Sequence, residues 1–288
     1  MNKKQFDNMH FFWSCAILVC LCLTVFSLFF VSCSKAEPQT TGATQSPGQP
    51  TPGPSPSPGQ QTPTPVPSGD PDGPGEGSVA VTVPAQTVLA ETPDMGQAYV
   101  DSFIFLGDST TYGLAAYDVV PDAQVWTPAS GTLTLAYWAT SPIVYPESGQ
   151  ELLIREAIEL KEPAYLLITL GVNGVSFMDE EYFKSEYAKL IAAVQEGSPS
   201  TKIVINSIYP VASHYEQLQH INNTNITAAN GWLQTLAETL GLPYLDSASV
   251  LIGDDGWLPE SLQNGDGLHL NPDGFNRVIG YLRTHGYE

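Results

Sequence analysis

Five short apolar runs, separated by helical patterns, constrain the fold of this chain more than any other feature of its sequence. The runs, each expected to be a strand, cover residues 103–106, 124–126, 165–170, 202–208 and 243–245. Apolar residues recur at helical spacing over residues 150–160, 180–195, 226–240 and 272–285. Strands that alternate with helices in this way predict an α/β domain, with a parallel sheet covered by helices on both faces.

The first apolar run ends in Gly107-Asp108-Ser109, and a helix is expected to follow over residues 110–116. A serine here lies at the carboxyl end of a buried parallel strand, where open α/β sheets place their ligands. Ser109 is therefore the candidate nucleophile. The same tripeptide is also typical of a turn whose Asp or Ser caps the next helix, so a capping role without catalysis is the alternative.

A serine nucleophile needs a base, and His269 is the best placed of the five histidines. It lies in a turn-rich loop, residues 264–272, with Asp266 three positions before it. A compact loop would set the Asp266 carboxylate against Nδ1 of His269 and leave Nε2 facing Ser109. The alternatives are that Asp266 is only a turn residue, or that the loop binds calcium. Because leucines stand where an EF-hand needs oxygen ligands, no metal is expected.

Two further loops follow strand candidates and could help to stabilise an oxyanion. Gly131 comes after the short strand near Trp126, and its backbone N–H could approach a substrate closely. Asn173 follows the run at 165–170 and could offer its side-chain amide. With the N–H of Ser109, these groups would make a hole with three donors. Each residue taken alone is more often part of an ordinary turn.

Four motifs stand in order along the domain: Gly107-Asp108-Ser109, Gly131, Gly171-x-Asn173 and Asp266-x-x-His269. Together they resemble the SGNH hydrolases, also called GDSL esterases and lipases. The resemblance implies a flavodoxin-like three-layer α/β/α sandwich and hydrolysis of ester-linked acyl groups without a metal or other cofactor. It also implies one role for each residue: Ser109 as nucleophile, His269 as general base and acid, Asp266 as its orienter, and Gly131 and Asn173 as oxyanion donors.

The chain departs from the family pattern at two positions. Thr110 replaces the usual Leu after the serine, which should matter little. Gly174 stands where many members have Asp, so the support of the Asn173 side chain is in question. The nucleophile motif also differs from the Gly-x-Ser-x-Gly elbow of α/β-hydrolases, which makes that other serine hydrolase fold a poor match.

Residues 1–33 predict export from the cytoplasm. Lys3 and Lys4 precede an uncharged apolar stretch at 11–31, which is the pattern of a signal peptide. Phe30-Val31-Ser32-Cys33 resembles a bacterial lipobox with Phe in place of the usual Leu, and Cys33 would then carry the lipid. The stretch is also long enough to remain as a transmembrane anchor. Either outcome tethers the rest of the chain to the outer face of a membrane.

Residues 34–78 predict a disordered linker and residues 79–288 a single hydrolase domain. The linker is dominated by Pro, Thr, Ser and Gly, a composition that stays extended and solvated. It is expected to act as a stalk or as a plain spacer. All four cysteines precede it, so the exported part has no disulfide.

The domain is strongly acidic. Five of the 30 acidic and three of the 10 basic residues precede position 79, which leaves 25 and 7 in the domain. Such a surface repels phosphate backbones, so nucleic acid is not expected as a partner. Neutral sugars or their esters fit better as small-molecule or polysaccharide substrates. A monomer is expected.

These features predict a cell-surface serine esterase that removes acyl groups, most readily acetyl, from carbohydrate or peptidoglycan. Five aromatic residues near the first two strands could face sugar rings or acyl chains, although about half should be core: Tyr112, Trp126, Tyr137, Trp138 and Tyr145. The alternatives are a non-catalytic glycan-binding module on the same fold, and a lipase or lysophospholipase of the same family.

Overall fold

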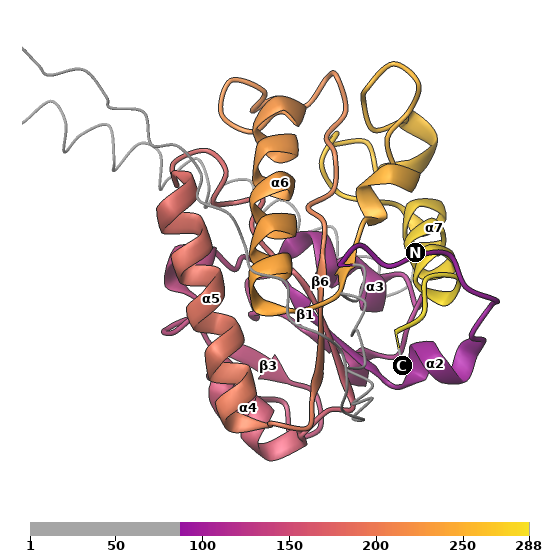
Figure 1. The fold of residues 1–288 in the computed structure, drawn as a ribbon. Coiled ribbons are helices and arrows are strands. Elements are labelled where there is room, and N and C mark those ends of the chain that lie inside the picture. Colours follow the sequence, from indigo (N-terminus) through magenta and orange to yellow (C-terminus); the bar gives the residue numbers. More distant parts are fainter. Residues whose placement is uncertain (1–86, 288) are drawn as a thin grey trace, which may run out of the picture. The chain divides into compact units, whose positions relative to one another are not determined.

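Five parallel strands form the central sheet of the computed structural model, which describes residues 87–287 (Figure 1). The strands are β1 (Phe103–Gly107), β2 (Val125–Trp126), β5 (Tyr165–Thr169), β6 (Lys202–Asn206) and β7 (Tyr244–Leu245). Their spatial order is β2-β1-β5-β6-β7, which is the flavodoxin-like order of a doubly wound sheet. The predicted fold class is confirmed, and all five strands lie within the apolar runs or one residue beyond them. The predictions for residues 1–33, with Cys33, and for 34–78 concern residues outside this range.

Helices cover both faces of the sheet, which makes three layers (Figure 1). Alternate residues of β1 point to opposite faces, so Ile104 and Leu106 enter one core cluster while Phe103 and Phe105 enter the other. The first cluster is covered by α4 (Ile154–Lys161), α5 (Glu180–Gly197) and α6 (Asn223–Leu240). The second is covered by α2 (Gln97–Asp101), α3 (Ser109–Ala116) and α7 (Pro272–Arg283). Strands buried on both faces explain why the runs are apolar throughout rather than alternating.

Side-chain caps set where the long helices begin. The Asn222 side chain accepts a hydrogen bond from the N–H of Asn225, so α6 begins at Asn223, earlier than its apolar spacing predicted. At its other end, Gly241 takes a left-handed conformation with φ of 65°. Asn271 caps α7 in the same way, and Pro272 occupies the first turn, where a missing N–H costs nothing.

The helix predicted over residues 150–160 is partly wrong, because its first residues form a strand. β4 (Gln150–Leu152) pairs antiparallel with β3 (Ile143–Tyr145) in a small second sheet. Gly149 makes the connecting turn with φ of 69°, a conformation that glycine adopts readily. The Glu156 side chain then accepts a hydrogen bond from the N–H of Leu153 at 2.9 Å, which fixes the start of α4 at Ile154.

The amino-terminal part of the described chain lies along the outer edge of β7. Val88 bridges Tyr244 in parallel, and Asp94 forms two hydrogen bonds with the Arg283 guanidinium near the end of α7, at 2.8 and 2.5 Å. Both contacts tie residues 87–95 to the carboxyl-terminal part of the domain. Within residues 87–287, none of the helices has the length and apolar character that crossing a membrane requires.

Candidate active site

Ser109 is the first residue of α3, directly after the end of β1. The side chain of Asp108 caps this helix, since its Oδ1 accepts hydrogen bonds from the Thr110 N–H at 3.0 Å and the Thr110 hydroxyl at 2.7 Å. The capping role therefore belongs to Asp108, and Ser109 is left for another task. Its N–H is one of the first helical amides, which have no acceptor inside the helix. Thr110 adds a second hydrogen bond to the cap that the usual Leu could not make.

Gly107 allows the serine turn to lie close to the neighbouring strand. A Cβ at this position would lie 2.3 Å from the Thr169 carbonyl oxygen of β5 and 2.1 Å from Oγ1 of Thr111. The first of these contacts is with backbone, so no rotamer change would relieve it. A side chain at Gly107 would push α3, and Ser109 with it, away from the end of β5.

The structure brings Ser109, His269 and Asp266 together in one hydrogen-bonded chain. Nε2 of His269 lies 2.8 Å from Oγ of Ser109, across 160 residues of sequence. Nδ1 of His269 lies 2.7 Å from Oδ2 of Asp266. The carboxylate accepts the Nδ1 proton, so Nε2 keeps its lone pair toward the serine hydroxyl. This is the arrangement that a serine nucleophile and its general base require.

The loop before α7 holds the Asp266 carboxylate in place. Oδ1 of Asp266 accepts hydrogen bonds from the N–H groups of Leu268 at 2.8 Å and His269 at 2.9 Å. Partial burial alone would raise the pKa of Asp266, but the hydrogen bonds and charge of His269, with the two backbone N–H groups, lower it to about 2. The carboxylate is therefore ionised at neutral pH and can stabilise a positive imidazolium.

Asn173 lies in the loop after β5, and two acceptors orient its amide. Nδ2 donates to the Leu133 carbonyl oxygen at 3.1 Å, while Oδ2 of Asp108 is more distant at 3.5 Å. The second contact is at the limit for a hydrogen bond, so one amide hydrogen is only weakly held on the side of the serine turn. Leu133 and Asp108 thus provide the support that Gly174 cannot. A Cβ at Gly174 would lie 2.8 Å from Sδ of Met178, so a larger residue would have to displace that side chain.

Asp108 is a buried carboxyl group beside the nucleophile. Its exposed fraction is only 1%, and this burial raises its pKa to about 6, although the hydrogen bonds from Thr110 oppose the shift. The charge of His269 also opposes it. A carboxyl group between the nucleophile turn and Asn173 therefore titrates closer to neutral pH than an ordinary aspartate.

The N–H of Gly131, which is predicted to be an oxyanion donor, has another acceptor in this conformation. Its N–H donates to the Pro128 carbonyl oxygen at 2.8 Å, closing a turn in which Gly131 has φ of 72°. A donor used in this way does not also point at a substrate oxygen, because one N–H makes one good hydrogen bond. The Ser109 N–H and the Asn173 amide are the remaining donors of the predicted three.

Most of the aromatic residues expected to face substrate are core. Trp126, Trp138 and Tyr145 are buried, whereas Tyr137 is 63% exposed. Tyr112 is half-buried and lies three residues after Ser109 on α3, so the two side chains share a face of the helix. Tyr112 and Tyr137 are the two that a substrate could reach.

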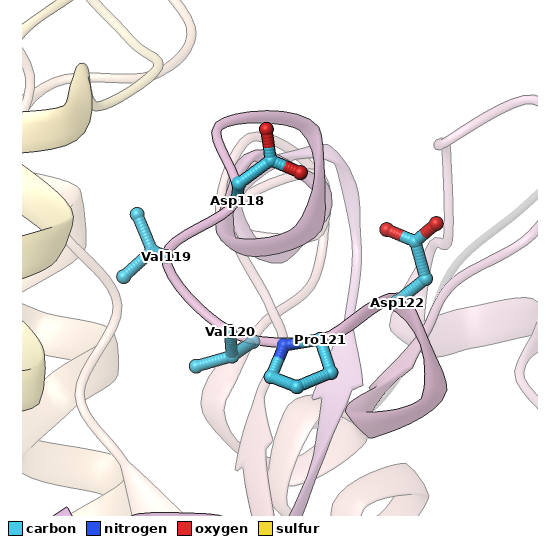
Figure 2. Close-up of a pocket in the computed structure, with 5 residues that line it drawn as sticks. All are labelled: Asp118, Val119, Val120, Pro121 and Asp122. Atoms are coloured by element: carbon cyan, nitrogen blue, oxygen red, sulfur yellow. The ribbon is translucent and has the colours of Figure 1, made fainter.

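A hollow on the described surface lies apart from the hydrogen-bonded chain of Ser109, His269 and Asp266, none of which lines it. The hollow has a volume of about 400 Å³ and is lined by residues 118–122, just after α3. Figure 2 shows these lining residues. Asp118 and Asp122 contribute its two carboxylates. Among the residues that the structure describes, no group of three or more His, Cys, Asp or Glu side chains is placed to hold a metal ion.

Comparison with known protein families shows to which family the chain belongs. The model of the GDSL-like lipase/acylhydrolase family matches residues 105–277, which is more than half of the sequence and contains Ser109, Asn173, Asp266 and His269. The chain belongs to this family. As a GDSL-like acylhydrolase it is a hydrolase of carboxylic esters. No curated protein matches the chain.

Three solved structures illustrate the similarity of this GDSL-like acylhydrolase to other proteins. A GDSL-like lipase from Bacteroides thetaiotaomicron is 17% identical, covers 65% of this chain and 88% of its own, and has a TM-score of 0.46. An acetylxylan esterase from Geobacillus stearothermophilus is 16% identical, with 65% and 94% covered and a TM-score of 0.41. A carbohydrate esterase of family 3 from Talaromyces cellulolyticus is 14% identical, with 62% and 92% covered and a TM-score of 0.41.

Proposed function

We propose that this GDSL-like acylhydrolase is a cell-surface serine esterase that removes short acyl groups, acetyl above all, from carbohydrate or peptidoglycan. The observation that carries the proposal is the hydrogen-bonded chain from Ser109 Oγ through His269 to Asp266, with distances of 2.8 and 2.7 Å. A glycan-binding module needs no such chain. In a hydrolase it is the group that activates the nucleophile.

The reaction proceeds through an acyl-enzyme. Oγ of Ser109 attacks the ester carbonyl carbon as its proton moves to Nε2 of His269, and a tetrahedral intermediate forms. The imidazolium returns the proton to the leaving alcohol oxygen as the C–O bond breaks. Water then attacks the acyl-serine carbonyl carbon as His269 takes a proton from it. The bond from the acyl carbon to Oγ breaks, His269 returns the proton to Oγ, and the carboxylic acid leaves. Asp266 stays ionised throughout and stabilises the imidazolium.

Two donors support the oxyanion in this proposal. The Ser109 N–H stands at the amino end of α3, where the helix dipole also favours negative charge. The Asn173 amide is oriented by Leu133 and keeps one hydrogen only weakly bound. Stabilisation by such fixed donors is worth several kcal/mol in an acyl transfer, about 2.7–4 per donor.

The charge around the site favours a neutral substrate over a phospholipid. The loop that carries His269 lies beside Glu260, whose Oε1 pairs with Nδ1 of His214 at 2.9 Å, and the domain as a whole has 25 acidic and 7 basic residues. An anionic headgroup would be repelled from such a surface, whereas an acetylated sugar carries no charge. The half-buried Tyr112, on the same helix face as Ser109, offers a ring to a sugar.

The proposed location rests on residues 1–33 and 34–78 of the sequence. A lipid on Cys33, followed by an extended linker, would hold the domain away from the membrane and close to wall polymers. Labelled palmitate supplied to expressing cells should enter the wild-type protein and not the Cys33→Ala variant, whereas Cys22→Ala should be labelled normally. Label in Cys33→Ala, or none in the wild type, would contradict the lipid anchor.

The test of activity is a series of p-nitrophenyl esters with the purified protein beside Ser109→Ala. We expect the rate to be highest with acetate, lower with butyrate and lowest with octanoate, and to disappear in the variant. Acetate release is then compared between acetylated xylan and O-acetylated peptidoglycan, to identify which polymer carries the ester that the enzyme hydrolyses. A rate that rises with acyl length would favour a lipase instead. Equal rates for wild type and Ser109→Ala, with both folded, would favour the glycan-binding module.

A further inference from the structure

One buried side chain braces the loop that carries Asp266 and has no role in the reaction as described. Gln263 is 5% exposed and begins the loop that ends in His269. Its backbone bridges Leu270 in antiparallel fashion, and the Asn264 N–H donates to the His269 carbonyl oxygen at 2.9 Å. These contacts close the loop at its base, with the Gln263 side chain inside it.

The Gln263 carboxamide oxygen binds the backbone on both sides of Asp266. Oε1 accepts hydrogen bonds from the N–H of Gly265 at 2.5 Å and from the N–H of Gly267 at 3.1 Å. Both glycines have positive φ, 109° and 81°, which turns their N–H groups toward the same point. A single acceptor thus fixes the backbone immediately before and after the aspartate.

The other end of the carboxamide is held as well. Nε2 of Gln263 donates to Oε2 of Glu260 at 2.6 Å, and the other carboxylate oxygen of Glu260 pairs with Nδ1 of His214 at 2.9 Å. The side chain therefore cannot rotate without breaking contacts at both ends. This rigidity is transmitted to Asp266, because the two N–H groups that Gln263 holds flank that residue.

We propose that Gln263 is a positioning residue for catalysis, which sets the Asp266 carboxylate against His269 by binding the N–H groups of Gly265 and Gly267. The inference rests on the proposed triad of Ser109, His269 and Asp266. Removal of the carboxamide frees both glycine N–H groups, and the carboxylate loses its fixed approach to Nδ1. Misplacement of a catalytic group by about 1 Å can cost about 10²-fold in rate.

The variants are Gln263→Ala and an exchange in which Glu260→Gln is combined with Gln263→Glu. In the exchange, a carboxylate at 263 still accepts from both glycine N–H groups, and the amide at 260 donates back to it, so length, hydrogen bonds and net charge are conserved. Gln124→Ala is the matched control. Gln124 is also a buried glutamine, 7% exposed, but it donates to the Val100 and Phe103 carbonyls near the amino end of β1.

Two measurements are made on the full-length protein: the kinetics of p-nitrophenyl acetate hydrolysis, which give kcat and KM, and the NMR signal of the His269 Nδ1 proton. This proton signal is assigned by its loss in Asp266→Ala. For Gln263→Ala we expect kcat to fall by about 10–100-fold with KM changed by less than about twofold, and the proton signal to shift or broaden. The exchange should restore kcat and the proton signal to their wild-type values. Gln124→Ala should lower the unfolding midpoint and leave kcat and the proton signal unchanged.

The proposal is overturned if Gln263→Ala keeps kcat within about threefold of wild type, or loses kcat while the proton signal is unchanged. An exchange variant that recovers neither quantity would also overturn it. Failure of the proposed function gives a different result, in which wild type and Ser109→Ala hydrolyse the ester equally. The proton signal can be read in that case too, so the two failures are distinguishable.

Discussion

Replacement of Asp266 by Asn should prevent His269 from acting as the general base while leaving the shape of the site intact. The asparagine Oδ1 can still accept the Leu268 and His269 N–H groups, now at 2.8 and 2.9 Å, so the loop keeps its backbone. An NH₂ group then stands where Oδ2 lies 2.7 Å from Nδ1. Because that group can only donate, the imidazole must present a lone pair at Nδ1 and a proton at Nε2. A protonated Nε2 cannot accept the proton of Ser109.

The expected loss in kcat is about 10⁴-fold, the size of the effect in another triad where the wrong tautomer is imposed. At about 1.4 kcal/mol for each factor of ten, this raises the barrier by about 5.5 kcal/mol. The assay is the initial rate with p-nitrophenyl acetate, beside Asp273→Asn, an exposed aspartate in the first turn of α7, as the matched control. A folded Asp266→Asn enzyme that loses less than about tenfold would refute the orienting role.

The same substitution should change how the free energy of unfolding depends on pH. The pKa of Asp266 is lowered to about 2, against about 3.9 in an unfolded chain, so its ionised form stabilises the folded protein above pH about 4. This contribution is lost as the pH falls toward 2. The difference in the free energy of unfolding between wild type and Asp266→Asn should therefore change in favour of the variant as the pH falls below about 4. A difference independent of pH would contradict the lowered pKa.

Four further substitutions test other parts of the structure. Asn173→Ala should lower kcat by about 10²–10³-fold with little change in KM, and activity within about threefold of wild type would exclude the amide as an oxyanion donor. Burial raises the pKa of Asp108 to about 6, so the folded wild type becomes less stable as this group ionises. Between pH 4 and 6 the free energy of unfolding of the wild type should fall by up to about 3 kcal/mol relative to Asp108→Asn, as measured by denaturant titration. A rise over the same pH range would contradict this. In Gly113→Ala the new Cβ would lie 2.4 Å from the Phe275 ring, so we expect a loss of about 1–3 kcal/mol in thermal unfolding. Gly231→Ala, with open space around it, should instead stabilise its helix by about 0.5–1 kcal/mol.

The sheet could be predicted because its strands are buried on both faces. Residues such as Ile104 and Phe105 point in opposite directions yet both enter a core cluster, so the sequence is apolar at consecutive positions. The hairpin of β3 and β4 could not be predicted in this way. Residues 150–152 continue the helical spacing of α4, and only the turn at Gly149 and the pairing with β3 make them a strand.

Some features of the site could be predicted from the local sequence, and others could not. Asp266 and His269 are three residues apart, so a turn alone can join them, and their contact follows from the loop sequence. The state of the Gly131 N–H depends instead on the turn that it closes with Pro128, which residue type alone does not reveal.

Gln263 was missed because a polar residue in a loop carries no distinctive pattern. The available signal is the pair of glycines around Asp266. Gly267 is buried, so its backbone N–H needs an acceptor inside the protein, and Gln263 provides it.

The central claim is that Ser109 is an activated nucleophile, and a fluorophosphonate probe tests it most directly. The probe phosphonylates a serine only where a neighbouring base has taken its proton. Mass spectrometry after labelling should find the adduct on Ser109 in the wild type, and a strongly slowed reaction in His269→Ala. A folded protein that takes no label, or takes it on another residue, would contradict the account.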